Sequence, residues 1–213
     1  MIDDFVSWLG PQAQIFAVAI LTGVVGFIGK TAYDIWLGRR KDKLERVNRQ
    51  LRELYGPLLS LAEASSITWD AFAFKYCNPP DFTVEEGVSP LTPNGEKIWR
   101  HWMQTVFMPL NENMAQLVVK QADLLEEEEM PKCLRLLCAH VHGYKGVMAA
   151  WQNGDYSQHM SLTHFPGAEL DAYARARYRE LKTRQARLLG GHKRIPPKSG
   201  ARTGLELLLD NPR

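Results

Sequence analysis

The first thing this sequence lacks is charge near its N-terminus, since no Asp, Glu, Lys or Arg occurs from Phe5 to Gly29. A helix of a soluble domain needs a polar face, and the segment 15–29 offers only Thr22. The basic region that opens a signal peptide is also missing, because Asp3 and Asp4 precede the apolar run, and no small-residue cleavage site follows it. These absences argue against a soluble core helix and against a cleaved signal.

Cysteine is scarce as well. Cys77, Cys133 and Cys138 are three in number and follow no framework spacing, so we expect reduced thiols in a cytosolic domain rather than a disulfide scaffold. The sequence has no glycine-rich phosphate loop, no HExxH and no GxSxG. We therefore predict no catalytic residue and no cofactor.

What the N-terminal region does contain is enough apolar chain for a transmembrane helix over residues 11–37. Such a helix needs about 20 mostly apolar residues. Pro11 is compatible with its first turn, and Trp8 and Trp36 flank the run, as tryptophans do at membrane interfaces. The predicted membrane anchor comprises Ile15, Phe16, Leu21, Gly23, Gly26, Gly29 and Trp36.

Basic residues on one side of this helix predict its orientation. A cluster comprising Arg39, Arg40, Lys41 and Lys43 should face anionic lipid on the cytoplasmic side. Residues 1–10 would then form a short non-cytoplasmic N-terminus. The glycines at every third position predict close approach of a second helix, although glycine is also simply common in membrane helices.

The remainder of the chain has helical periodicity and no strand-like alternation. We predict an all-α protein, in which an amphipathic juxtamembrane stalk over residues 38–56 continues the membrane helix. Residues 57–189 should form a cytoplasmic antiparallel bundle of four to five helices. Pro57 and Pro109 are each expected to kink or break a helix, because proline lacks the N–H and clashes with the carbonyl four residues earlier. Residues 190–213 are predicted to be a flexible basic tail.

Bulky apolar residues within the predicted body are expected to be covered. Trp69 and Phe74 carry large rings, which favours burial in a packed bundle. The segment 77–95 contains four prolines and two glycines and is predicted to be the longest loop of the body. Residues 153–166 are predicted to be a polar link between the last two long helices.

Two residues are candidate metal ligands. Cys138 and His142 lie four positions apart and share a helical face, as two ligands would, but no further ligand repeats at a suitable spacing. We therefore predict no metal site, with a buried cysteine and with the histidines near the surface. The acidic run 126–129 is interpreted as helix N-terminal charge rather than as a cation site.

Charge alternates in blocks along the chain. Residues 30–52 hold eight basic and three acidic residues, residues 81–129 three basic and ten acidic, and residues 175–202 ten basic and one acidic. The last block is expected to pair with the acidic middle or with lipid. We do not expect nucleic-acid binding, because the last helix has no aromatic platform or recognition motif beside its arginines.

Three segments carry a resemblance: LERVNRQLRELYGPLLSLAEA (44–64), HWMQTVFMPLNENM (101–114) and LLEEEEMPKCLRLLCAHVHGY (124–144). They resemble uncharacterised bacterial single-pass membrane proteins with a helical cytoplasmic domain. The resemblance implies an inner-membrane setting and supplies no catalytic residue.

The favoured hypothesis is a non-enzymatic, single-pass inner-membrane protein whose cytoplasmic body binds a protein partner or another copy of itself. Two alternatives stay open. One is a membrane-disrupting or signalling effector of a stress or phage-defence system, and the other is a membrane-bound enzyme with an unrecognised site.

Overall fold

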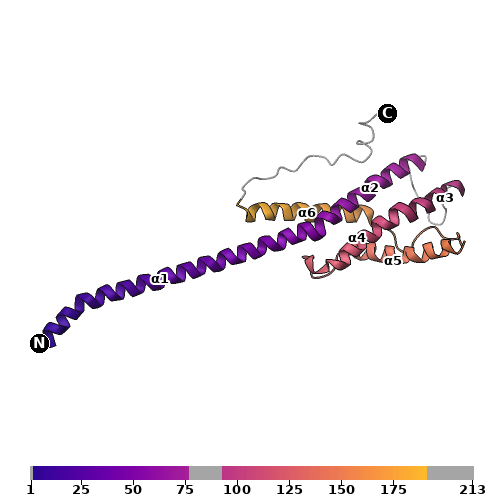
Figure 1. The fold of residues 1–213 in the computed structure, drawn as a ribbon. Helices are drawn as coiled ribbons and strands as arrows, with labels where there is room; N and C mark the ends of the chain where they lie inside the picture. The colour runs from indigo at the N-terminus through magenta and orange to yellow at the C-terminus, as the bar shows by residue number, and fades with distance from the viewer. Residues whose placement is uncertain (1, 77–92, 191–213) are drawn as a thin grey trace, which may run out of the picture. The chain divides into compact units, whose positions relative to one another are not determined.

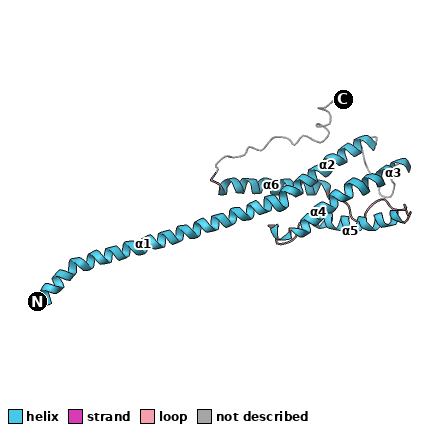
Figure 2. Ribbon diagram, viewed as in Figure 1, coloured by secondary structure: helices cyan, strands magenta, loops and turns pink. Residues whose placement is uncertain are grey.

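The computed structural model describes residues 2–76 and 93–190. For residues 2–14, 16–19 and 93–94 it describes the backbone only. Every regular element in these ranges is helical, as Figure 2 shows, and none is a strand, which confirms the predicted all-α class. Figure 1 traces their order. The elements are α1 (Ile2–Arg49), η1 (Gln50–Tyr55), α2 (Gly56–Tyr76), α3 (Pro93–Trp102), η2 (Met103–Phe107), α4 (Met108–Lys120), η3 (Ala122–Leu124), α5 (Lys132–Gln152) and α6 (Gly167–Leu188).

The chain divides into two compact units, residues 1–46 and 47–213. The division falls within α1, so the last residues of that helix belong to the second unit. There, Val47, Leu54 and Tyr55 form a small core with Leu124 and Leu181. Val47, Leu54 and Leu58, which lie at helical spacing where the predicted stalk meets the predicted bundle, are buried.

The main core of the second unit lies between α2, α4, α5 and α6. α2 packs against α6 and α4, and α4 packs against α5 (Figure 1). Leu58, Met114, Leu137 and Leu170 are among its fully buried side chains. A core of this kind removes apolar surface from water and is the main source of stability.

The two predicted proline kinks take a specific form. η1 precedes Pro57 and η2 precedes Pro109, and both stretches are π-helical. The carbonyls expected to clash with the prolines belong to Glu53 and Thr105, which lie inside these π-helical stretches. The wider turn accommodates each proline, so the helix changes its pitch and does not break.

Helix ends follow the local sequence. Gly190 adopts a positive φ of 83° and donates its N–H to the carbonyl of Arg187, so it ends α6 as predicted. Gly154 likewise has a positive φ of 79° and donates its N–H to the carbonyl of Trp151 at the end of α5. The predicted loop over 77–95 and the predicted tail over 190–213 fall almost wholly outside the described residues.

One prediction about the core is wrong. Phe74 is 69% exposed, whereas Trp69 is 37% exposed and lies within an aromatic cluster. The Trp69 ring is 5.9 Å from the rings of Phe72, Trp99 and Phe107. Phe74 points away because residues 72 and 74 lie about 200° apart around a helix, so only one of them can face the core.

Candidate functional site

The first candidate site is the apolar surface of α1. The described part of the chain contains one helix, near the N-terminus, that is long and apolar enough to span a membrane. Ile15, Leu21 and Trp36 are 65%, 64% and 54% exposed, so these predicted anchor side chains contact no protein core. Phe16 lies in the same helix, but its side chain is outside the described set. Such exposure of consecutive large apolar side chains is unusual for a surface in water.

The three predicted anchor glycines also face open space. A Cβ placed on Gly23, Gly26 or Gly29 would meet no atom within 4 Å. Within a single chain these glycines are therefore not required by packing, and their faces are accessible to another molecule.

The basic cluster follows directly along α1. Its guanidinium and ammonium groups are supplied by Arg39, Arg40, Lys41 and Lys43. The Arg40 guanidinium lies 5.4 Å from the centroid of the Trp36 ring, a cation–π contact that joins the end of the apolar run to the start of the cluster.

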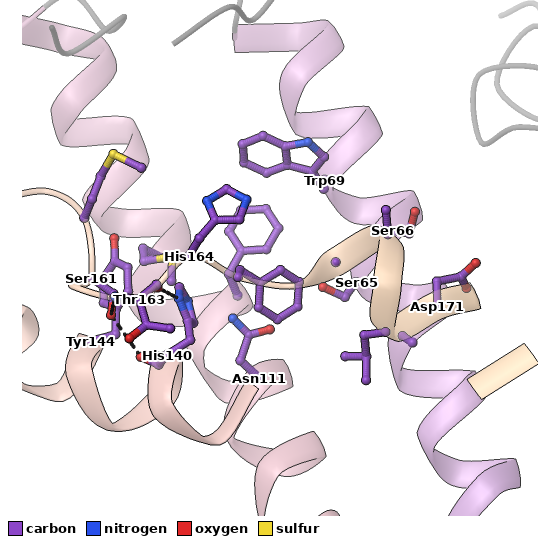
Figure 3. Close-up of a pocket in the computed structure, with 18 of the residues that line it drawn as sticks. Ser65, Ser66, Trp69, Asn111, His140, Tyr144, Ser161, Thr163, His164 and Asp171 are labelled. Carbon is purple, nitrogen blue, oxygen red and sulfur yellow. Dashed lines mark hydrogen bonds between the residues drawn. The ribbon is translucent and has the colours of Figure 1, made fainter. Parts of the chain in front are cut away.

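The second candidate site is a cavity of about 880 Å³ in the body, shown in Figure 3. Ligand-binding pockets of proteins commonly have volumes of roughly 300–1,000 Å³. Side chains of α2, α3, η2, α4 and α5 contribute to its wall, and the segment 153–166 and the start of α6 complete it. Its aromatic lining comprises Trp69, Trp99, Phe107, Tyr144 and Phe165.

The segment 153–166 is fastened over α5 by side chains that bind its backbone. Trp151 Nε1 donates to the carbonyl of Gln158 over 2.7 Å, and the Tyr144 hydroxyl donates to that of His159 over 2.5 Å. Trp99 Nε1 also donates to the His159 carbonyl (3.3 Å). These bonds hold residues 160–165, part of the predicted polar link, in the cavity wall.

Gly143 permits this close approach. A Cβ at this position of α5 would lie 2.6 Å from the Ser161 hydroxyl oxygen, which donates to the His140 carbonyl. The sequence signal that was missed is the apolar content of the link, where Met160, Leu162 and Phe165 occur.

His140 lies inside the body, which overturns the expectation that the histidines are near its surface. Its side chain is buried, and its Nδ1 lies 2.7 Å from the carbonyl oxygen of Thr163. Burial disfavours the charged ring and lowers the pKa of His140, and the bond to Thr163 only partly opposes this effect. On α5, His140 is buried, whereas His142 is exposed.

The candidate metal ligands are not gathered into a site. Cys138 is half-buried against the main core, and His142 is exposed. Among residues 2–76 and 93–190, no three His, Cys, Asp or Glu side chains lie close enough together to hold a metal ion. Burial raises the pKa of the Cys138 thiol, which makes it less nucleophilic.

The acidic run 126–129 does not lie in the first turn of a helix, so its interpretation as helix N-terminal charge is wrong. α5 begins at Lys132 with no acidic residue in its first turn. Instead, Glu127 binds Arg177 and Glu126 binds Arg184 (2.6 Å), both on α6. This confirms the predicted pairing of the basic last helix with the acidic middle of the chain.

Comparison of the chain with protein-family models, with curated proteins and with solved structures gives no match.

Proposed function

We propose that this protein is a single-pass, inner-membrane-anchored module that binds a protein partner or a second copy of itself and has no catalytic activity. In this proposal α1 spans the bilayer with its N-terminus outside. The helical body is an antiparallel bundle in the cytoplasm. Membrane lipid is one partner, and nucleic acid is not one.

The observation that carries the proposal is the exposure of the apolar part of α1. Val25, Phe27 and Ile28 are 61%, 72% and 60% exposed. Burial of apolar surface is worth about 25 cal/mol per Å², so a run of such side chains strongly favours hydrocarbon over water. The α-helix satisfies its own backbone hydrogen bonds, as a membrane requires.

The interface residues support the proposed orientation. Trp36 and the adjoining basic cluster stand at one end of the apolar run, where an indole ring and cationic side chains suit the headgroup region. Tyr33 lies 6.1 Å from Trp36, ring to ring, and adds a second amphipathic ring at this level.

Membrane attachment is tested by placing charge in the apolar run. The variant Val25→Asp/Ile28→Asp should move the full-length protein from the membrane pellet to the supernatant in detergent-free lysate. Each Asp costs roughly 2.5–3.5 kcal/mol at the centre of a spanning helix. Val119→Asp is the matched control, because Val119 is 65% exposed on the body and should tolerate the charge. A double variant that pellets as wild type does contradicts the anchor.

Self-association is supported by the open glycine face and by exposed apolar side chains of the body, such as Leu162 (93%) and Met160 (58%). Crosslinking in native membranes should capture a defined oligomer or partner. If the glycine face makes the contact, Gly26→Ile reduces the crosslinked dimer, whereas Val24→Leu leaves it unchanged. Recovery of monomer only would contradict the interaction role.

A further inference from the structure

Two buried polar side chains in the cavity have an atom without a partner. His140 Nε2 and Asn111 Oδ1 are both fully buried atoms with no hydrogen bond, and the two side chains are only 6% and 4% exposed. Figure 3 shows both side chains among the cavity residues, with His140 bonded to Thr163 on its other side. An unsatisfied buried acceptor costs about 1–3 kcal/mol, so such atoms call for a partner.

The chemistry of His140 defines what that partner must be. A carbonyl oxygen only accepts, so Nδ1 must donate its proton to Thr163. In the neutral ring the other nitrogen, Nε2, then carries a lone pair and is an acceptor. Asn111 Oδ1 is an acceptor as well. Both atoms therefore require a hydrogen-bond donor.

Aromatic and apolar side chains make up a large part of the wall, which also includes the polar residues Ser65, Ser66, Ser161, Thr163, His164 and Asp171. The rings of Trp69, Trp99 and Phe107 lie 5.9 Å from one another, and Phe165 lies 5.3 Å from His140. Such a wall favours a flat or apolar body, which would contact the ring faces and edges.

The charge in the wall argues against an ionic ligand. The carboxylate that lines the cavity, Asp171, is already bound by the guanidinium of Arg175 (3.0 Å). Arg175 also binds Glu63 (2.6 Å), so the three groups form a closed network of their own. A cation beside His140 would have no free counter-charge, and burying an unpaired charge is costly.

We infer that the cavity binds an uncharged, largely aromatic or apolar small molecule with a hydroxyl or N–H group that donates to His140 Nε2, and that Asn111 Oδ1 is the acceptor for a second donor group. This site is separate from the membrane helix and does not depend on it. His140 and Asn111 select the donor, and the surrounding rings bind the apolar body.

A pair of probes that differ only in the donor tests this inference. 2-Naphthol carries a hydroxyl, and 2-methoxynaphthalene has the same rings without the donor. Binding to the full-length protein in nanodiscs is measured by equilibrium dialysis, with empty nanodiscs as the blank for partition into lipid. One neutral hydrogen bond predicts about fivefold to tenfold tighter binding of the naphthol.

His140→Asn is the decisive variant. The Asn side-chain amide can still donate to the Thr163 carbonyl, so we expect the fold to be retained. The acceptor at the Nε2 position is removed. We expect the preference for 2-naphthol to fall to about parity. His142→Asn, on the exposed face of the same helix, is the matched control and should keep the wild-type preference.

Three outcomes would overturn the inference. They are equal binding of both probes to the wild type, no saturable binding of either probe, and a preference that survives in His140→Asn. Tighter binding of naphthalen-2-ylmethylammonium than of 2-naphthol would also overturn it, because it would identify a cation site. None of these outcomes bears on membrane attachment, which the pelleting experiment tests separately.

Discussion

Glu127 is the carboxylate on which the polar contacts between the acidic run and α6 converge. It accepts hydrogen bonds from Arg177 and from the hydroxyl of Tyr173 (3.2 Å to Oε1), and Tyr173 in turn contacts the hydroxyl of Tyr55 (3.3 Å). Burial, the largest single effect, opposes ionisation of Glu127, but the hydrogen bonds and charge of Arg177, together with hydrogen bonds from the backbone and from Tyr173, outweigh it and lower the pKa of Glu127. The ionised form is therefore part of the folded structure.

We predict that Glu127→Gln lowers the free energy of unfolding at pH 7 by about 1–2 kcal/mol, because it removes the charge partner of a half-buried arginine. A lowered folded-state pKa means that this stability is present above the unfolded value near 4.5 and is lost as the pH falls through the folded value. Urea denaturation between pH 7 and pH 3 measures both effects. The neighbouring Glu128 is exposed, so Glu128→Gln should change neither.

His140 makes the stability of the fold depend on pH in a higher pH range than Glu127 does. The folded-state pKa of His140 lies below the ordinary 6.5, because of burial and the nearby His164. The Asp171 carboxylate also lines the cavity. As the pH falls below 6.5 the unfolded chain binds a proton that the folded chain does not, so stability decreases until the folded pKa is reached.

We therefore expect the melting temperature of the wild type to fall between pH 7 and pH 5, and that of His140→Asn to fall less. The difference between the two proteins should narrow toward low pH in thermal denaturation followed by circular dichroism. A difference that stays constant over this range would contradict the buried neutral state of His140.

At the scale of elements, the π-helical stretches are the distinctive feature. Each ends two residues before a proline, and Gly56 directly follows η1. The Gly56 N–H donates to the carbonyl of Leu51, and a Cβ at Gly56 would overlap that same oxygen. The glycine therefore permits the wide turn that accommodates Pro57.

We predict that Gly56→Ala lowers the free energy of unfolding by about 1–3 kcal/mol, since the atom in the way is backbone and cannot move aside. Gly146→Ala is the contrasting variant, because a Cβ at this exposed position of α5 meets nothing within 4 Å. There alanine should raise stability by about 0.5–1 kcal/mol through its higher helix propensity. Chemical denaturation of both variants checks the two signs.

The helices were predictable because their buried faces repeat at helical spacing. On α5, Leu134, Leu137, Val141 and Tyr144 recur every three or four residues, and all four are buried. The positions of Pro57 and Pro109 predicted where the helices are irregular. The π-helical form could not be predicted, since it depends on how the neighbouring carbonyls rearrange.

The cavity was not predictable in the same way. Its wall needs residues 160–165 to return onto α5, and that arrangement depends on hydrogen bonds to backbone carbonyls, which side-chain periodicity does not encode. The inward position of His140 follows from the same contact with Thr163. The pairing of the acidic middle with the basic last helix was predictable from the charge blocks, but the individual roles of Glu126 and Glu127 were not, because charge blocks do not specify which carboxylate meets which arginine.

For the whole molecule, the two compact units have different surfaces. In the unit comprising residues 1–46, large apolar side chains are exposed from Ile20 to Trp36. In its described part, the second unit buries many large apolar residues in two cores and pairs several of its charges. A protein of this kind is expected to be held in a bilayer by the first unit and to fold in water through the second.

The proposed orientation gives the last prediction. Replacing Arg39, Arg40, Lys41 and Lys43 by alanine removes four positive charges beside the spanning segment, where the positive-inside effect acts. A fraction of the chains should then invert, and protease added to intact spheroplasts should digest their bodies. The matched control removes four exposed basic residues of the body, Lys97, Lys132, Arg135 and Arg179, which lie too far along the chain to direct insertion. If the wild-type body is already digested, or if the two variants are equally protected, the basic cluster does not set the orientation.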